Sequence, residues 1–182
     1  MQELKRLRGQ SSFAKVRESQ YAYYDRWYLP ILRELVVHGN WNGSFSKLAK
    51  LVRSPISAKE AQDGVELLLR IGLIKRIAGG RYAQVDSLVS AEGIPGVVLR
   101  QARTEYMLRA IEATETLSKT ERHASYAVIG TTRKKFEEYS QRMDELRREF
   151  LQSLDSAEPV ECVYAVSFQA FPLTNSFEDK TP

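Results

Sequence analysis

The sequence predicts an α+β protein with an N-terminal winged helix-turn-helix, followed by a helix, a strand, a long helix and a strand. Three observations lead to this prediction. First, amphipathic helices precede two short apolar runs around Gly79-Gly80. Second, stretches with helical periodicity alternate with stretches of strand periodicity in the second half of the chain. Third, the composition of 43% hydrophobic and 27% charged residues is typical of a folded domain. We therefore expect a basic segment over residues 1–20, a winged-helix domain over 21–88, a second domain over 95–174 and a flexible tail over 175–182.

The first helix is expected around Tyr23 to His38, because its apolar residues repeat at alternating spacings of three and one. Pro30 lies inside this pattern and cannot donate a backbone hydrogen bond. Either the helix kinks there or its regular part begins near Leu29, and the continuous apolar stripe favours a kink. The members of that stripe are Tyr24, Trp27, Tyr28, Ile31, Leu32, Leu35 and Val36.

Two further helices and a hairpin follow. A short helix is expected over residues 44–52, and Ser57 with Glu60 forms a capping-box pattern that opens a third helix ending near Ile71. Gly72 is a natural left-handed stop for that helix. The apolar runs 73–77 and 81–85 flank Ala78-Gly79-Gly80, which indicates a β-hairpin, the wing of the motif.

The second half is expected to contain two helices and two strands. One helix should run from Val97 to Leu117 after Pro95, and a longer one from Thr132 to Leu154. Strands are expected over residues 124–129 and 162–171, because both runs are apolar and short.

Positive charge is concentrated in the first half of the chain. The chain carries a net charge of +4; residues 50–81 hold seven bases against three acids, and residues 1–20 hold five bases against two. This asymmetry predicts a contact with a polyanion such as duplex DNA. The candidate DNA-binding residues lie before and at the start of the third helix and on the wing: Arg53, Ser57, Lys59, Gln62, Lys75, Arg76 and Arg81.

The third helix also carries Glu60, Asp63 and Glu66, which would repel phosphates. A winged helix that serves only as a scaffold for dimerisation or docking is therefore the serious alternative. The aromatic cluster in the first helix could stack single-stranded bases, but its helical spacing favours core packing or a subunit interface. Its members are Tyr21, Tyr23, Tyr24, Trp27 and Tyr28.

One further stretch resembles a ligand site. Gly130 ends an expected strand and is followed by two hydroxyls and three bases, so the helix N-terminus there could hold a small anion. Ordinary helix capping by Thr131 or Thr132 is the more common use of such residues. The candidate anion-binding residues are Thr131, Thr132, Arg133 and Lys134.

Enzymatic and metal chemistry are disfavoured. The chain has two histidines, His38 and His123, and one cysteine, Cys162, which is too few for a thiolate metal cluster or an intrachain disulfide. It lacks the nucleophile-elbow, phosphate-loop, dinucleotide-binding and zinc-protease motifs. No cofactor is expected, and the absence of a signal sequence or membrane span predicts a cytoplasmic protein.

Three strings carry a family resemblance. They are Tyr23-Tyr-Asp-Arg-Trp-Tyr28 with Ile31-Leu-Arg-Glu-Leu-Val36, Glu60-Ala61 through Leu67-Leu68 and Gly72-Leu73, and Val163-Tyr164 with Gln169-Ala-Phe-Pro-Leu-Thr174. Over roughly residues 21–174 they resemble the bacterial family called domain of unknown function 4423, a large paralogous family in Fibrobacter and related bacteria.

The resemblance implies a regulator-like protein and brings no catalytic residue or ligand. Typical members place a separate repressor-like helix-turn-helix ahead of this region, whereas only about 20 residues precede Tyr21 here. We expect a non-enzymatic transcription-regulator-like protein that contacts duplex DNA. We also expect a homodimer, for which the aromatic first helix offers apolar area. The alternative is a protein-interaction or small-ligand sensor module whose winged helix never meets DNA.

Overall fold

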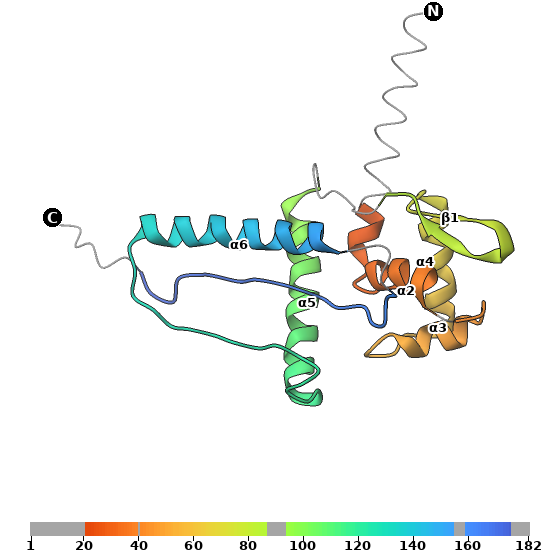
Figure 1. Cartoon of the computed structure of the whole chain (residues 1–182), viewed down its shortest axis with the longest axis horizontal. Coiled ribbons are helices and arrows are strands. Elements are labelled where there is room, and N and C mark those ends of the chain that lie inside the picture. Colours follow the sequence, from red (N-terminus) through yellow and green to blue (C-terminus); the bar gives the residue numbers. More distant parts are fainter. Residues whose placement is uncertain (1–20, 40, 87–93, 155–158, 176–182) are drawn as a thin grey trace, which may run out of the picture. The chain divides into compact units, whose positions relative to one another are not determined.

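The computed structural model describes residues 21–39, 41–86, 94–154 and 159–175 (Figure 1). The expectations for residues 1–20 and for most of the C-terminal tail, residues 176–182, lie outside the described residues. The chain divides into two compact units. The first unit contains the described residues up to Arg122 together with 159–164, and the second contains those from His123 to Leu154 together with 165–175.

The N-terminal helix of the first unit is interrupted before its proline. Residues 21–25 are helical, residues 26–28 form a bend and turn, and α2 runs over Leu29–His38. Pro30 therefore lies in the first turn of α2, where a missing N–H costs no intrahelical hydrogen bond. The expected single helix with a kink at Pro30 is thus wrong, and the alternative of a regular helix beginning near Leu29 is correct.

The next two helices follow the predicted bounds closely. Helix α3 spans Phe45–Leu51 and α4 spans Ala58–Arg70. The capping box at the start of α4 is present in full, since Ser57 and Glu60 each hydrogen-bond the other's backbone amide. Gly72 adopts a left-handed φ of 75° and terminates the helix as predicted.

These helices enclose the core of the first unit. Leu29 and Leu32 of α2 and Leu68 of α4 are completely buried. Helices α2 and α4 approach closely at Gly64, where an added Cβ would lie 2.6 Å from Cδ1 of Leu32. The absence of a side chain at Gly64 therefore sets the distance between the two helices. The buried core residues are Tyr23, Tyr28, Leu29, Leu32, Val36, Trp41, Leu48, Ala49, Val52, Ala61, Val65, Leu68 and Ile74.

A two-stranded antiparallel hairpin follows α4. Strand β1, Ile74–Arg76, pairs with β2, Tyr82–Gln84, and Ala78–Gly80 forms a single 3₁₀ turn, η1, at the tip. The base of the hairpin is fixed to α2 by two contacts. Gln84 Nε2 donates to Glu34 Oε2 at 2.8 Å, and the buried guanidinium of Arg33 donates to the carbonyl of Asp86.

Helix α5, Gly96–Thr116, is joined to the rest of the first unit by polar side chains. The Tyr106 hydroxyl donates to the Trp27 carbonyl at 3.1 Å, and the Arg109 guanidinium lies 4.7 Å from the centre of the Trp27 ring. The Ser54 hydroxyl donates to Glu112 Oε2 at 2.6 Å. These contacts tie α5 to the turn before α2 and to the turn between α3 and α4.

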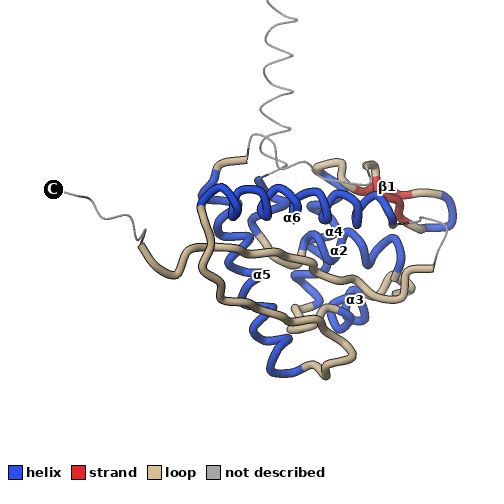
Figure 2. The backbone as a smooth tube through the Cα atoms, turned by 60° about the vertical axis from the view of Figure 1, so that its left-hand side comes forward, coloured by secondary structure: helices blue, strands red, loops and turns tan. Residues whose placement is uncertain are grey.

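The second unit contains α6, Arg133–Ser153, and little other regular structure. The expected strands over residues 124–129 and 162–171 are wrong for the single chain, because neither segment is assigned as strand among the described residues. Figure 2 draws both as elongated loops. The sequence correctly marks them as non-helical and apolar, but a strand exists only where a neighbouring strand accepts its backbone hydrogen bonds.

The fold is thus α+β, mostly helical with a small two-stranded antiparallel sheet. Within the residues that the structure describes, no helix is long and apolar enough to cross a membrane.

Candidate nucleic-acid interface

The hairpin presents a basic surface of the first unit. Residues 74–85 contain Lys75, Arg76 and Arg81 and no acidic residue. All three bases are exposed, and none of them forms an ion pair with another described residue. Three cationic side chains are therefore available to an external anion.

Strand geometry distributes these bases over both faces of the hairpin. Lys75 lies opposite Ala83 and Arg76 opposite Tyr82, so the two bases point to opposite faces. The amide of Ile77 donates to the carbonyl of Arg81 at 2.9 Å, and this continued pairing places Arg81 on the same face as Lys75. The bases therefore surround the hairpin near its tip and do not form a single-sided stripe.

The tip itself contains almost no side chain. Gly79 and Gly80 have φ values of 74° and 71°, which only glycine adopts without strain. An added Cβ at either position would meet nothing within 4 Å. Nothing in the tip would therefore keep a phosphate backbone away from the flanking bases.

The candidate residues on α4 are exposed, but their polar groups already have partners. Lys59 Nζ lies 3.0 Å from Asp63 Oδ2, and Gln62 Nε2 donates to Glu66 Oε1 at 2.9 Å. Within each pair the two residues are four positions apart, so their side chains meet on the solvent-exposed face of the helix. A nucleic acid would have to displace these partners before it could bind Lys59 or Gln62.

The N-terminus of α4 is occupied by its own carboxylate. Glu60 Oε2 accepts hydrogen bonds from the Ser57 amide and the Ser57 hydroxyl, each at 2.8 Å. The backbone hydrogen bond and then the hydroxyl lower the pKa of Glu60, so the group is ionised at neutral pH. A phosphate approaching Ser57 would therefore meet the negative charge of Glu60 at the positive end of the helix dipole.

Arg53 also has an acidic partner. Its Nη2 lies 3.0 Å from Glu121 Oε1, and its side chain is 69% exposed. Hydrogen bonds from the side chain and backbone of Ser118, and then from Arg53, lower the pKa of Glu121. All seven predicted DNA-binding residues are thus exposed, but only the three on the hairpin lack a partner among the described residues.

The candidate anion site before α6 has the geometry of a helix cap. Thr132 is the N-cap residue, and its hydroxyl accepts from the Lys135 amide at 3.2 Å. Arg133 Nε lies 3.2 Å from Glu137 Oε1, while Thr131 and Lys134 are exposed. These contacts are those of the capping alternative.

The aromatic residues around α2 belong mainly to the core. Tyr23 and Tyr28 are buried, and Tyr24 and Trp27 pack against the core with part of their surface exposed. The rings of Tyr23 and Tyr24 meet edge to face at 5.2 Å, as do those of Trp27 and Tyr28 at 5.8 Å. Core packing, the interpretation favoured by the helical spacing, is confirmed for these four residues.

The structure reveals one polar network that the sequence pattern does not predict. It links Ser54, Trp27, Tyr106, Arg109 and Glu112, and Arg109 Nη1 lies 3.2 Å from Glu112 Oε2. Arg109 and Glu112 are three residues apart on one helix, a spacing that indicates only a local ion pair. Their long-range partners could not be read from the sequence.

The histidines and the cysteine do not cluster. His38 Nε2 lies 3.9 Å from Glu34 Oε2, and His123 Nε2 lies 3.2 Å from the Ser125 hydroxyl. Cys162 is exposed and free. In the part of the chain that the structure describes, no group of three or more His, Cys, Asp or Glu side chains could hold a metal ion.

Fold and surface together define an α+β protein whose first unit is a small helical bundle with a basic hairpin. The family model named Domain of unknown function (DUF4423) matches residues 7–173. The chain therefore belongs to this family, as the sequence resemblance indicated. No curated protein and no solved structure matches the chain.

Proposed function

We propose that the first unit is a winged helix-turn-helix that binds duplex DNA, and that the protein is a non-enzymatic, transcription-regulator-like protein. The order of elements supports this proposal, since α2, α3 and α4 precede the β1–β2 hairpin. Helix α3 packs on α4, and Val52 in the short connection between the two helices is buried. In this motif the last helix enters the major groove, and the wing contacts the backbone or the minor groove.

The observation that carries the proposal is the hairpin with three unpaired bases and no acid. Each base that neutralises a phosphate releases condensed counterions, so the affinity depends on salt. The attachment of the hairpin to α2 through Glu34 and Arg33 fixes the backbone that carries these bases. A hairpin whose backbone is already ordered loses less backbone entropy on binding than a flexible loop.

The test is a salt titration of binding to random duplex DNA. The triple variant Lys75→Ala, Arg76→Ala and Arg81→Ala should bind every sequence more weakly. It should also flatten the slope of log K against log salt by about 0.9 for each phosphate that the variant no longer neutralises. The control removes three exposed bases of α5 and the turn after it, through Arg100→Ala, Arg103→Ala and Lys119→Ala. An equal loss of binding in both variants would contradict a specific role for the hairpin.

The acids of α4 provide a second test. If α4 faces the major groove, Glu60→Gln with Asp63→Gln should strengthen binding by removing repulsion. Glutamine at position 60 preserves the capping box, so α4 should keep its start. Unchanged affinity would mean that α4 points away from the DNA.

A second candidate function is a protein-interaction or ligand-sensing module in which the winged helix is a scaffold. The paired, largely acidic surface of α4 favours it, because base-reading helices generally present Arg, Lys, Asn or Gln to the groove. This function predicts no affinity for duplex DNA at low salt and no response to either set of substitutions.

A further inference from the structure

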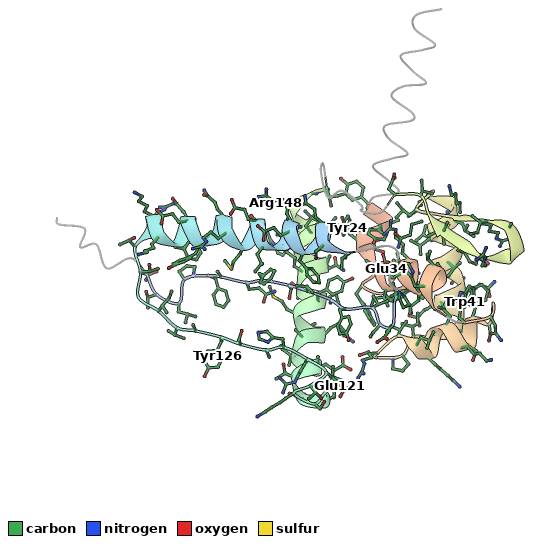
Figure 3. The ribbon with its side chains drawn as sticks, in the orientation of Figure 1. Tyr24, Glu34, Trp41, Glu121, Tyr126 and Arg148 are labelled. Atoms are coloured by element: carbon green, nitrogen blue, oxygen red, sulfur yellow. The ribbon has the colours of Figure 1, made fainter. Side chains whose placement is uncertain are left out.

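Two segments of the C-terminal half have the composition of strands but no strand partner. The first edge segment, residues 124–129, and the second edge segment, residues 165–171, contain no charge, no proline and no glycine. Tyr126 is 94% exposed, as its labelled side chain illustrates in Figure 3, and Val128 and Phe171 are 73% and 67% exposed. Neither segment joins a sheet among the described residues.

Proteins rarely leave such edges open. Exposed strand edges are normally protected by charges, by proline or by short length, because they otherwise pair with other chains. The only sheet in the described part of the chain is β1–β2, whose strands have three residues each and pair with one another. The hairpin of the first unit therefore offers no strand long enough to cover the two edge segments.

Helix α6 likewise has an apolar stripe that is not buried. None of the 21 residues of α6 is buried, although Phe136, Tyr139, Leu146 and Phe150 follow a helical spacing on one face. The exposed surface of these four side chains, added to that of the large apolar side chains on the two edge segments, is roughly 1,000 Å². A stable protein interface requires about 800 Å² from each partner, so the second unit has sufficient area for one.

We propose that a second copy of this chain covers this surface by strand exchange. Within the second unit the two edge segments run in the same direction, with α6 returning between them along the chain (Figures 1 and 2). This is the arrangement of a split β-α-β unit, which leaves room for a strand between its two parallel strands. The first edge segment of the partner copy supplies that strand.

A twofold axis makes this arrangement self-consistent. The first edge segments of the two copies pair antiparallel across the axis, and each also pairs with the second edge segment of the other copy. The result is a four-stranded antiparallel sheet with the second edge segments outermost and both α6 helices packed on it. The interface is isologous, so two copies satisfy the pairing across the twofold axis. Because the two segments remain unpaired in the single chain, exchange is favoured over a sheet completed within each copy.

A dimer of this kind goes beyond the proposed DNA binding and does not depend on it. It also uses a different surface from the aromatic first helix, whose residues Tyr23 and Tyr28 are already buried in the core.

The first experiment is sedimentation equilibrium of the full chain with matched substitutions. Ile129→Lys introduces a charge on the first edge segment, where Ile129 is 67% exposed, and should raise the dimer dissociation constant at least 30-fold. Ile111→Lys makes the same change on α5, where Ile111 is 58% exposed, and should leave the constant unchanged. Both tryptophans, Trp27 and Trp41, lie in the first unit, so their fluorescence verifies that this unit remains folded.

Two results would overturn the dimer. A parent chain that stays monomeric at about 100 μM would do so, since burial of this area should give at least micromolar affinity. A dimer weakened by Ile111→Lys but not by Ile129→Lys would place the contact elsewhere.

Disulfide trapping tests the exchange directly and does not require a destabilised variant. In a Cys162→Ser background, Ala127→Cys is combined in turn with Ser167→Cys and with Gln169→Cys, which sample nearby registers on one face. Exchange predicts that oxidation yields a dimer linked between position 127 of one copy and the second edge segment of the other, as peptide mapping would identify. Bonds formed only within one chain would contradict the exchange.

Discussion

The first and second units are built from similar amphipathic patterns but differ in what those patterns bury. In the first unit, Leu29, Leu32, Leu48 and Leu68 are completely buried, because three helices and a hairpin meet around them. In the second unit the stripe of α6 is as regular in sequence, yet none of its residues is buried. An apolar stripe therefore specifies which face of a helix can be buried. The surrounding elements determine whether that face is covered.

The largest effect should come from removing a core leucine of the first unit. Leu68→Ala should lower the free energy of unfolding by about 2–5 kcal/mol, the range for a fully buried leucine that leaves a cavity. Leu146→Ala on α6 makes the same chemical change at a side chain that is 53% exposed. Urea denaturation at a concentration where the chain is monomeric, followed by the fluorescence of Trp27 and Trp41 in the first unit, should show a change below about 0.5 kcal/mol for Leu146→Ala. Equal losses would contradict the exposed position of Leu146 on α6 and would also mean that the two units unfold together.

A second prediction concerns the close approach of α2 and α4. Gly64→Ala gains up to about 1 kcal/mol of helix propensity but forces its methyl group against the buried Leu32. Overpacking generally costs about 1–3 kcal/mol, so we expect a net loss of roughly 1 kcal/mol. Gly96→Ala at the start of α5 is the control, since an added Cβ meets nothing within 4 Å there. A stabilised Gly64→Ala variant would show that α2 and α4 can separate without cost.

Tyr106, which attaches α5 to the Trp27 carbonyl, predicts how the free energy of unfolding changes at alkaline pH. Burial, and to a lesser extent the neighbouring Tyr24, raises the pKa of Tyr106 from 10.0 to about 12. The unfolded chain loses this proton first, so the contribution of Tyr106 is complete below pH 10 and is lost as the pH rises towards 12. Tyr106→Phe should cost about 1 kcal/mol at pH 7 through removal of the hydrogen bond to Trp27.

The pH profile of this variant provides the check. Tyr106→Phe should lose less stability than the parent between about pH 10 and 12, although buried Tyr23, whose pKa is also raised, leaves part of the decline. A parallel decline in the Tyr106→Phe variant and the parent would contradict a buried, hydrogen-bonded Tyr106.

The smallest effect is expected for the exposed ion pair of Arg53 and Glu121. Arg53→Ala should change the free energy of unfolding by no more than about 0.5 kcal/mol, because solvent screens a pair this exposed. Any large loss of DNA affinity in this variant would then report contact with the nucleic acid and not a weakened fold. A loss of stability above about 1 kcal/mol would instead assign Arg53 a structural role.

Local signals in the sequence predicted most of the first unit. The capping box at Ser57 and Glu60, the stop at Gly72 and the hairpin around Gly79 each depend on neighbouring residues, so their structures agree with the pattern. The break before Pro30 was assigned wrongly because a continuous apolar stripe does not distinguish a kinked helix from two short ones. The strands in the second half were wrong for a related reason, since pairing depends on a distant partner that periodicity does not reveal.

For the candidate interface, residue type predicted exposure but not partners. All seven candidate DNA-binding residues are exposed, as expected of charged and polar side chains next to turns. The ion pair between Arg53 and Glu121 joins residues 68 positions apart, and the link between Ser54 and Glu112 joins residues 58 apart. Such contacts arise only when helices pack, so spacing along the chain carries no signal for them.

The bare glycine tip of the hairpin has a consequence for engineering the protein. The Ile77 amide donates to the Arg81 carbonyl across the loop, and a Cβ added at Gly79 or Gly80 would meet nothing within 4 Å. Inserting a few residues between Gly79 and Gly80 would therefore disturb no side-chain packing, and would cost the single 3₁₀ turn η1 and the added entropy of loop closure. Doubling the loop length costs about 0.6 kcal/mol, which leaves the first unit free to carry a short peptide epitope or a fluorescent label at that position.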